Sequence, residues 1–107
     1  MQIPLTTTLI LSFTLMAGCT WVELNDKGRS VIIVTAEQLS PACERIGVIN
    51  ASTRDSIVAG THRNTHKVQQ ELNTLARNEA GQMKSNTIVA QAPATEGKQS
   101  FIAYRCP

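Results

Sequence analysis

The sequence predicts an α+β fold, in which one amphipathic helix covers one face of a four-stranded mixed sheet held by one disulfide. Four runs of strand length are rich in β-branched or other apolar residues, which is typical of strands. Between the second and third runs the apolar residues change to helical spacing. Cys43 opens the second run and Cys106 closes the fourth, so a disulfide would constrain how the strands pair. The order of elements is β-β-α-β-β.

The chain begins with an apolar segment that ends at residues 15–19, with the sequence LMAGC. Residues 5–17 contain no charged residue and are fewer than the roughly 20 that span a bilayer. Such a segment, followed by small residues, is typical of a signal peptide. We expect residues 1–18 to be a lipoprotein signal peptide and Cys19 to carry the lipid. The alternatives are a buried N-terminal helix and a plain membrane anchor.

Residues 19–29 are predicted to be a lipidated tether, and residues 30–107 a single α/β domain. Residues 25–28, with the sequence NDKG, have strong turn chemistry. In lipoprotein sorting, an Asp directly after the lipidated cysteine commonly retains a protein at the inner membrane. Because Thr20 stands there, we expect the outer membrane, on its periplasmic face, with the bilayer as partner through Cys19.

The first two strands are expected at residues 30–35 and 43–50. The first run is apolar at every interior position, which favours a strand covered on both faces. Gly47 stands in the middle of the second run. A glycine there indicates a bulge or the close approach of another group.

A helix is expected from Arg63 to Lys84, with Thr61 or Asn64 as its cap. Gly81 leaves two endings open: the helix continues to Lys84, or it stops at this glycine. Six apolar residues share one stripe at three and four spacings, namely Val68, Leu72, Leu75, Ala76, Ala80 and Met83. The residues expected to face away are Lys67, Gln70, Glu71, Thr74, Arg77 and Asn78.

The last two strands are expected at residues 87–91 and 100–106. Three cysteines make an odd count, and lipidation of Cys19 leaves Cys43 and Cys106 to pair in an oxidising compartment. They meet if the second and fourth strands are antiparallel neighbours, which places the fourth between the second and third. With the first strand outside the second, the order is 1-2-4-3. Because the spacing is not C-x-x-C, we expect a structural bridge rather than a redox pair.

The charge pattern argues against nucleic acid as a partner, because the net charge is +2 and no basic face is clustered. No phosphate-binding loop, nucleophile elbow or paired carboxylates occur. We therefore expect no catalytic residues, no cofactor and no enzymatic activity. His62 and His66 have the spacing of metal ligands on a helix, but they lack a third ligand nearby. We expect two solvated histidines.

Several elements form an ordered set that resembles a known family. With the lipobox, they are Gly28-x-x-Val31, Cys43-x-x-Ile46-Gly47-x-Ile49, Arg77-Asn78-x-Ala80-x-x-Met83-x-x-Asn86-x-Ile88 and Tyr104-x-Cys106. The set is similar to the domain-of-unknown-function 4156 family of small bacterial envelope lipoproteins. The resemblance implies a tethered, disulfide-held α/β module without assigned catalytic residues. In that family small residues, often glycines, precede the Asn at position 86, whereas here Lys84 and Ser85 do.

The segment from Met83 to Asn86 is also similar to the outer-membrane stress-sensor lipoprotein of the Rcs phosphorelay, which has a related α/β domain with disulfides. A sensing role is an analogy at the level of fold. Asn78 and Asn86 match the family pattern, and both have a structural and a binding interpretation. The structural one makes Asn86 a left-handed turn residue or a hydrogen-bonding cap between helix and strand.

The function predicted from these features is a non-enzymatic, membrane-anchored periplasmic lipoprotein that binds or senses an envelope partner. Two alternatives remain: an accessory factor or inhibitor of a cell-wall enzyme, and a weak metal-binding module that uses His62 and His66. The polar helix face with Lys67, Glu71 and Arg77 is expected to be solvated, and it is the first surface to test for a partner.

Overall fold

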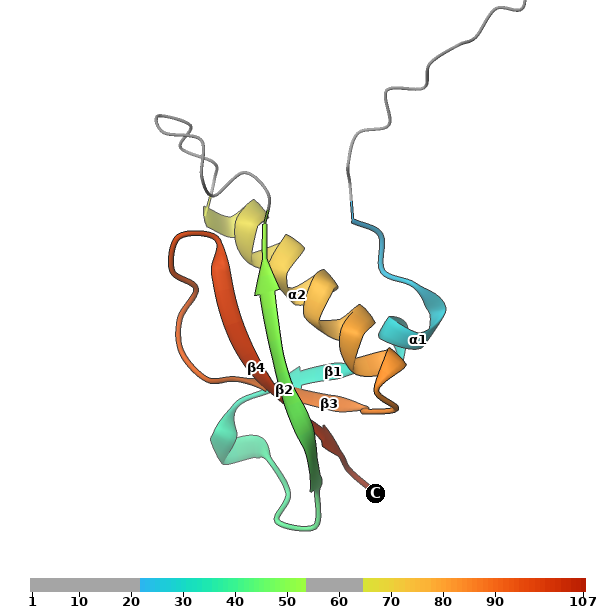
Figure 1. The fold of residues 1–107 in the computed structure, drawn as a ribbon. Coiled ribbons are helices and arrows are strands. Elements are labelled where there is room, and N and C mark those ends of the chain that lie inside the picture. The colour runs from blue at the N-terminus through green and yellow to red at the C-terminus, as the bar shows by residue number, and fades with distance from the viewer. Residues whose placement is uncertain (1–21, 54–64) are drawn as a thin grey trace, which may run out of the picture.

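The computed structural model describes residues 22–53 and 65–107 (Figure 1). Along the chain, the elements are α1 (Asp26–Arg29), β1 (Ile32–Val34), the 3₁₀ helix η1 (Ala36–Gln38), β2 (Glu44–Ser52), α2 (Thr65–Gln82), β3 (Thr87–Ala90) and β4 (Lys98–Arg105). The four strands form one mixed sheet. The predicted α+β class, the single long helix and the Cys43–Cys106 disulfide are confirmed. Cys19 and His62 lie outside the described residues, as do the helix caps expected at Thr61 or Asn64.

The strand order is β1-β3-β4-β2. β4 lies between β2 and β3 and is antiparallel to both, as predicted. The predicted order 1-2-4-3 is wrong for the first strand, because β1 pairs in parallel with β3 at the opposite edge. The disulfide constrains only β2 and β4, so it leaves β1 free to join either edge. The packing of α1 on the end of α2 brings β1 beside β3, which follows α2 directly.

The edge position of β1 also corrects the expectation that its two faces are covered. Ile32 and Ile33 are 57% and 39% exposed. Val31, just before the strand, is the fully buried residue of this segment. A continuous apolar run therefore marks an edge strand here, in which only part of the run reaches the core.

Gly47 lies at a bulge in β2, as predicted. Arg45 pairs with Tyr104 and Gly47 with Ala103, so Ile46 is an extra residue in the ladder. A Cβ atom at position 47 would lie 2.9 Å from the terminal methyl of Met83. The glycine thus lies at the bulge and beside the Met83 side chain, which follows α2.

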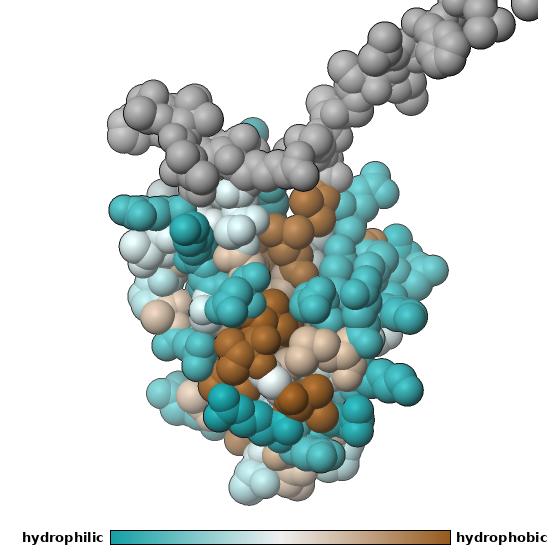
Figure 2. Space-filling model, viewed as in Figure 1, coloured by the Kyte–Doolittle hydropathy of each residue, from teal (hydrophilic) through white to brown (hydrophobic). Residues whose placement is uncertain are grey.

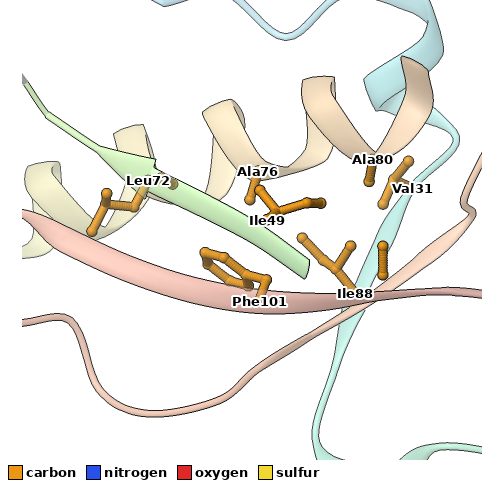
Figure 3. Close-up of a cluster of buried hydrophobic side chains, with 9 residues drawn as sticks. Val31, Ile49, Leu72, Ala76, Ala80, Ile88 and Phe101 are labelled. Atoms are coloured by element: carbon orange, nitrogen blue, oxygen red, sulfur yellow. The ribbon is translucent and has the colours of Figure 1, made fainter. Parts of the chain in front are cut away.

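The core lies between α2 and one face of the sheet (Figure 3). The predicted stripe of α2 faces it: Leu72, Ala76 and Ala80 are fully buried. The alanines allow the helix to come close to the sheet. The buried residues that surround them come from all four strand segments, namely Val31, Ile49, Ala51, Ile88, Phe101 and Ala103.

α2 continues through Gly81 and ends at Gln82, two residues before the predicted end. The chain then reverses in a Schellman motif. The Ser85 N–H donates to the Ala80 carbonyl at 2.9 Å, and the Lys84 N–H donates to the Gly81 carbonyl at 3.2 Å. Lys84 occupies the left-handed region, with a φ of 63°. That is the conformation for which glycine is favoured.

The described part of the predicted tether is folded onto α2. The predicted turn at residues 25–28 lies in the short helix α1, for which the Asn25 side chain caps the Gly28 N–H at 2.8 Å. Gly28 is buried, and a Cβ atom there would lie 3.1 Å from the Asn78 backbone nitrogen. The packed domain thus includes α1 as well as the residues after Ser30. Neither described helix is long and apolar enough to cross a membrane.

Candidate functional site

The Cys43–Cys106 disulfide joins the start of β2 to the end of β4, with the two Cα atoms 4.2 Å apart. Its neighbourhood is also held by Asn86. The Asn86 Oδ1 accepts from the Cys106 N–H at 2.8 Å, and its Nδ2 donates to the Cys106 carbonyl at 2.7 Å. The side chain therefore pairs with Cys106 as a strand residue would. Lys84, not Asn86, is the left-handed residue of this turn.

Asn78 is engaged with the segment that precedes α1. Its Oδ1 accepts from the Asn25 N–H at 2.9 Å, and its Nδ2 donates to the Glu23 carbonyl at 2.9 Å. Both ends of the amide are thus used to hold the N-terminal segment on the helix.

Arg77 has a similar role one residue earlier. Its Nε donates to the Val31 carbonyl at 2.8 Å, and its Nη2 donates to the Arg29 carbonyl at 3.3 Å. The expectation that Arg77 and Asn78 face away from the domain is therefore wrong. α1 covers this side of α2, and the polar residues there bind its backbone.

The rest of the predicted polar face is simpler. Lys67 is exposed and Glu71 is half-buried. His66 is exposed near the start of α2. Within residues 22–53 and 65–107, no group of three or more His, Cys, Asp or Glu side chains is placed to hold a metal ion. The structure thus brings no third ligand to His66 from these residues.

A hollow of about 330 Å³ lies over one end of the β2–β4 pair. Its lining residues are Asn50, Ala51, Ser52, Lys98, Gln99 and Ser100. The Ser100 hydroxyl donates to the Asn50 Oδ1 at 2.7 Å, so these groups satisfy each other. Lys98 is the single titratable residue in the lining, which provides no acid–base pair.

The face of the sheet opposite α2 is the largest feature that sequence reasoning did not identify. Side chains alternate along β2 and β4: Ile49 and Phe101 are paired and buried under α2, whereas Val48 and Ile102 are paired and face the other way. We call this second side the open face.

An apolar row crosses the open face in register. Val34 pairs with Val89, Val89 with Ile102, and Ile102 with Val48. These four residues, here named the apolar row, span all four strands. Val48 at one end is 45% exposed, Val34 and Ile102 are half-buried, and Val89 is buried. Figure 2 shows hydrophobic side chains at the centre of the face seen in Figure 1, where β2 lies in front.

A second line lies beside the row, where Ile32 pairs with Thr87 and Thr87 with Tyr104. Ile32 is 57% exposed. The strand residues on the open face that carry a charge are Arg45 and Lys98, and both are basic. Glu44 belongs to the other face and pairs with Arg105 at 4.0 Å. The open face therefore has a row of apolar residues, partly buried at Val89, with a cation toward each end of the β2–β4 pair.

The signal for this surface was present in the sequence. Consecutive apolar pairs, Val48-Ile49 and Phe101-Ile102, place apolar side chains on both faces of a strand. A single helix can cover only one of those faces. These apolar pairs therefore predict an apolar row on the face that the helix does not cover.

A family model described as "Domain of unknown function (DUF4156)" matches residues 22–106. The match begins before α1 and ends at Cys106, so it covers the whole packed domain described above. No curated protein and no solved structure matches the chain significantly.

Proposed function

The chain belongs to the family described as Domain of unknown function (DUF4156), and from this premise we propose that it is a non-enzymatic lipoprotein that binds an envelope partner on its open face. Its location in this proposal is the periplasmic side of the outer membrane, with the lipid on Cys19. The observation that carries the binding role is the apolar row, which lies on the side of the sheet away from α2. The accessible part of the row is its Val48 end, which is 45% exposed. Exposed apolar surface can mark an interaction site.

The anchor and the open face act together in this proposal. Val22, the first described residue, follows Cys19 by three positions. Three extended residues reach about 10 Å. A lipid on Cys19 would therefore hold the domain next to the bilayer surface, where its partner would also be a membrane-associated protein or an envelope component near it.

The polar face of α2 is less suited to this role. Arg77 and Asn78 already bind the backbone around α1. A partner on that side would have to displace α1 or use the remaining polar residues. At the β2 end of the open face, Val48 is already 45% exposed, so a partner there requires no such displacement.

The anchor is tested by Cys19→Ala in the full chain. The lipid accounts for membrane attachment in this proposal, so the variant should move to the soluble periplasmic fraction. A Cys19→Ala protein that still sediments with membranes would contradict the lipobox prediction.

The binding role is tested by photo-crosslinking in intact cells. A photoreactive residue at position 48 should capture a specific partner, because Val48 ends the apolar row and is exposed. The same residue at position 70, an exposed position on α2, is the matched control. Capture from position 70 but not from position 48 would show that the open face is not the binding surface.

A further inference from the structure

Within residues 22–53 and 65–107, the outer edge of β2 carries backbone groups without a strand partner, and they can be assigned residue by residue. The Thr53 N–H donates to the Gly97 carbonyl at 2.8 Å, which continues the β2–β4 register. Hydrogen-bonded and non-hydrogen-bonded pairs alternate along antiparallel strands. Ala51 and Ile49 therefore bond to β4, whereas Ser52, Asn50 and Val48 direct their N–H and C=O groups away from it.

The pairing of β4 with β3 gives the same assignment independently. The Gln91 N–H donates to the Ser100 carbonyl at 2.9 Å. Ser100 and Ile102 thus bond toward β3, which leaves the residues between them to bond toward β2. The three β2 residues with outward backbone groups are also those whose side chains lie on the open face. An added strand would therefore extend the sheet and the apolar row at once.

The bulge in β2 indicates what kind of strand can be added. Regular pairing along the free edge extends from Gly47 to Ser52 and is interrupted at Ile46. If the β2 strands of two copies paired symmetrically, the paired stretch would either include the bulge of each copy or be limited to the few residues from Gly47 to Ser52. An unrelated extended segment carries no bulge, so it can follow the edge and adjust where the ladder is interrupted.

The charges indicate the chemistry of that segment. Arg45 lies at one end of β2, and Lys98 pairs with Ser52 at the other. Neither forms an ion pair with another residue of the described chain. Lys98 lies on β4, one strand in from the edge. An added strand would lie two spacings of about 4.8 Å from it, and the long Lys98 side chain together with a carboxylate side chain can span that distance.

We propose that the β2 edge binds an extended segment of a partner protein, apolar over Val48 and acidic near Arg45 and Lys98. This inference rests on the proposed function and specifies the partner's chemistry. The segment completes the sheet at β2 as a fifth strand, with its backbone paired to Val48, Asn50 and Ser52. About seven residues span the distance between the two cations at about 3.3 Å per residue.

The test uses fluorescent peptide probes and the full chain in detergent, measured by fluorescence anisotropy. The first probe alternates valine and threonine over about eight residues, with an aspartate at each end. The second probe is identical except for lysines at both ends. We expect the aspartate probe to bind at least about tenfold more tightly, because opposite charges attract across the edge.

Two further probes separate strand addition from simple charge attraction. One carries N-methyl groups on the valine amides and the other on the threonine amides. Only one of these alternate sets can face β2. One methylated probe should therefore lose at least about tenfold in affinity while the other binds within about twofold of the parent.

The protein variant Arg45→Glu combined with Lys98→Glu tests the site from the other side. Both substitutions are at exposed positions, and they should reverse the preference toward the lysine probe. Equal binding of all probes, no binding at millimolar concentration, or an unchanged preference in the double variant would overturn the inference. A dimer in sedimentation that the aspartate probe dissociates would show that a second copy is the occupant instead.

The outcomes for the inference and for the proposed function are distinct. If the probes fail while crosslinking from position 48 still captures a partner in cells, the open face binds it without strand addition. If the probes succeed and the Cys19→Ala protein still sediments with membranes, the edge binds peptides but the anchor was misidentified.

Discussion

Asn86 supplies to Cys106 the hydrogen bonds that a neighbouring strand would otherwise give. Two bonds of 2.8 Å and 2.7 Å join its amide to the Cys106 backbone. Asn86→Ala leaves that N–H and that carbonyl without these partners, and we expect the free energy of unfolding to fall by about 1–3 kcal/mol. Urea unfolding with the disulfide intact measures the change. Gln91→Ala, at an exposed position, should remain within about 0.5 kcal/mol of the parent; an equal loss in both variants would contradict the assigned role.

Lys84 occupies a position that favours glycine. A left-handed conformation costs a residue with a Cβ about 1–2 kcal/mol, which is partly offset by the extra chain entropy that glycine loses on folding. Lys84→Gly should therefore raise the free energy of unfolding by about 0.5–1 kcal/mol in thermal or urea unfolding. Gln70→Gly, within α2, is the control and should lower it by about 1 kcal/mol. If Lys84→Gly lowered the free energy of unfolding as Gln70→Gly does, the left-handed conformation of Lys84 would carry no cost.

At the scale of elements, α1 packs on α2 through Gly28 of α1 and Gly81 of α2. A Cβ atom at position 81 would lie 2.6 Å from the Lys27 carbonyl carbon and 2.7 Å from its oxygen. Gly→Ala in a helix ordinarily stabilises by about 1 kcal/mol. Here the added methyl must push α1 away, so Gly81→Ala should destabilise by about 1–2 kcal/mol.

The loss of stability in Gly81→Ala is to be compared with that in Gly47→Ala. The group nearest to a Cβ there is the end of the flexible Met83 side chain, which can move aside. Thermal unfolding of both variants should show the larger loss for Gly81→Ala. Stabilisation by Gly81→Ala would mean that α1 is not held against α2 in solution.

The elements that could be predicted from the sequence are those with a strong local pattern. The apolar stripe from Val68 to Met83 follows helical periodicity over more than four turns. Gly47 marks the bulge in β2. The short helix α1 could not be predicted in the same way, because four residues give no period. Its position depends on contacts with Asn78 and Gly81, which are more than 50 residues away.

The position of β1 in the sheet also depends on long-range contacts. Its apolar run predicts a strand, but pairing with β3 is set by long-range packing of α1 on α2. The cysteine pair could be predicted from the sequence. Asn78 and Asn86 have a structural and a binding interpretation in the sequence, and both side chains bond to backbone groups of the domain. Sequence reasoning did not identify the apolar row, since its four residues come together only through the register of four strands.

At the scale of the whole molecule, two long-range ties define the domain. The disulfide joins residues 63 apart in the sequence and fixes β2 against β4. In the chain-entropy description, closing such a loop stabilises by about 4 kcal/mol. The second tie is polar: Arg77 and Asn78 fasten the N-terminal segment to α2. Both ties leave the β2 end of the open face accessible, where Val48 is 45% exposed, and this is the basis of the proposed binding role.

The most direct test of that role is hydroxyl-radical footprinting of the anchored protein in isolated outer membranes, compared with the Cys19→Ala form in solution. We expect labelling of Ile32, Val48 and Tyr104 on the open face to fall in the membranes, because the partner covers them. Labelling of His66, exposed on α2, should stay the same. Unchanged labelling of the open face, with protection confined to α2, would contradict the account.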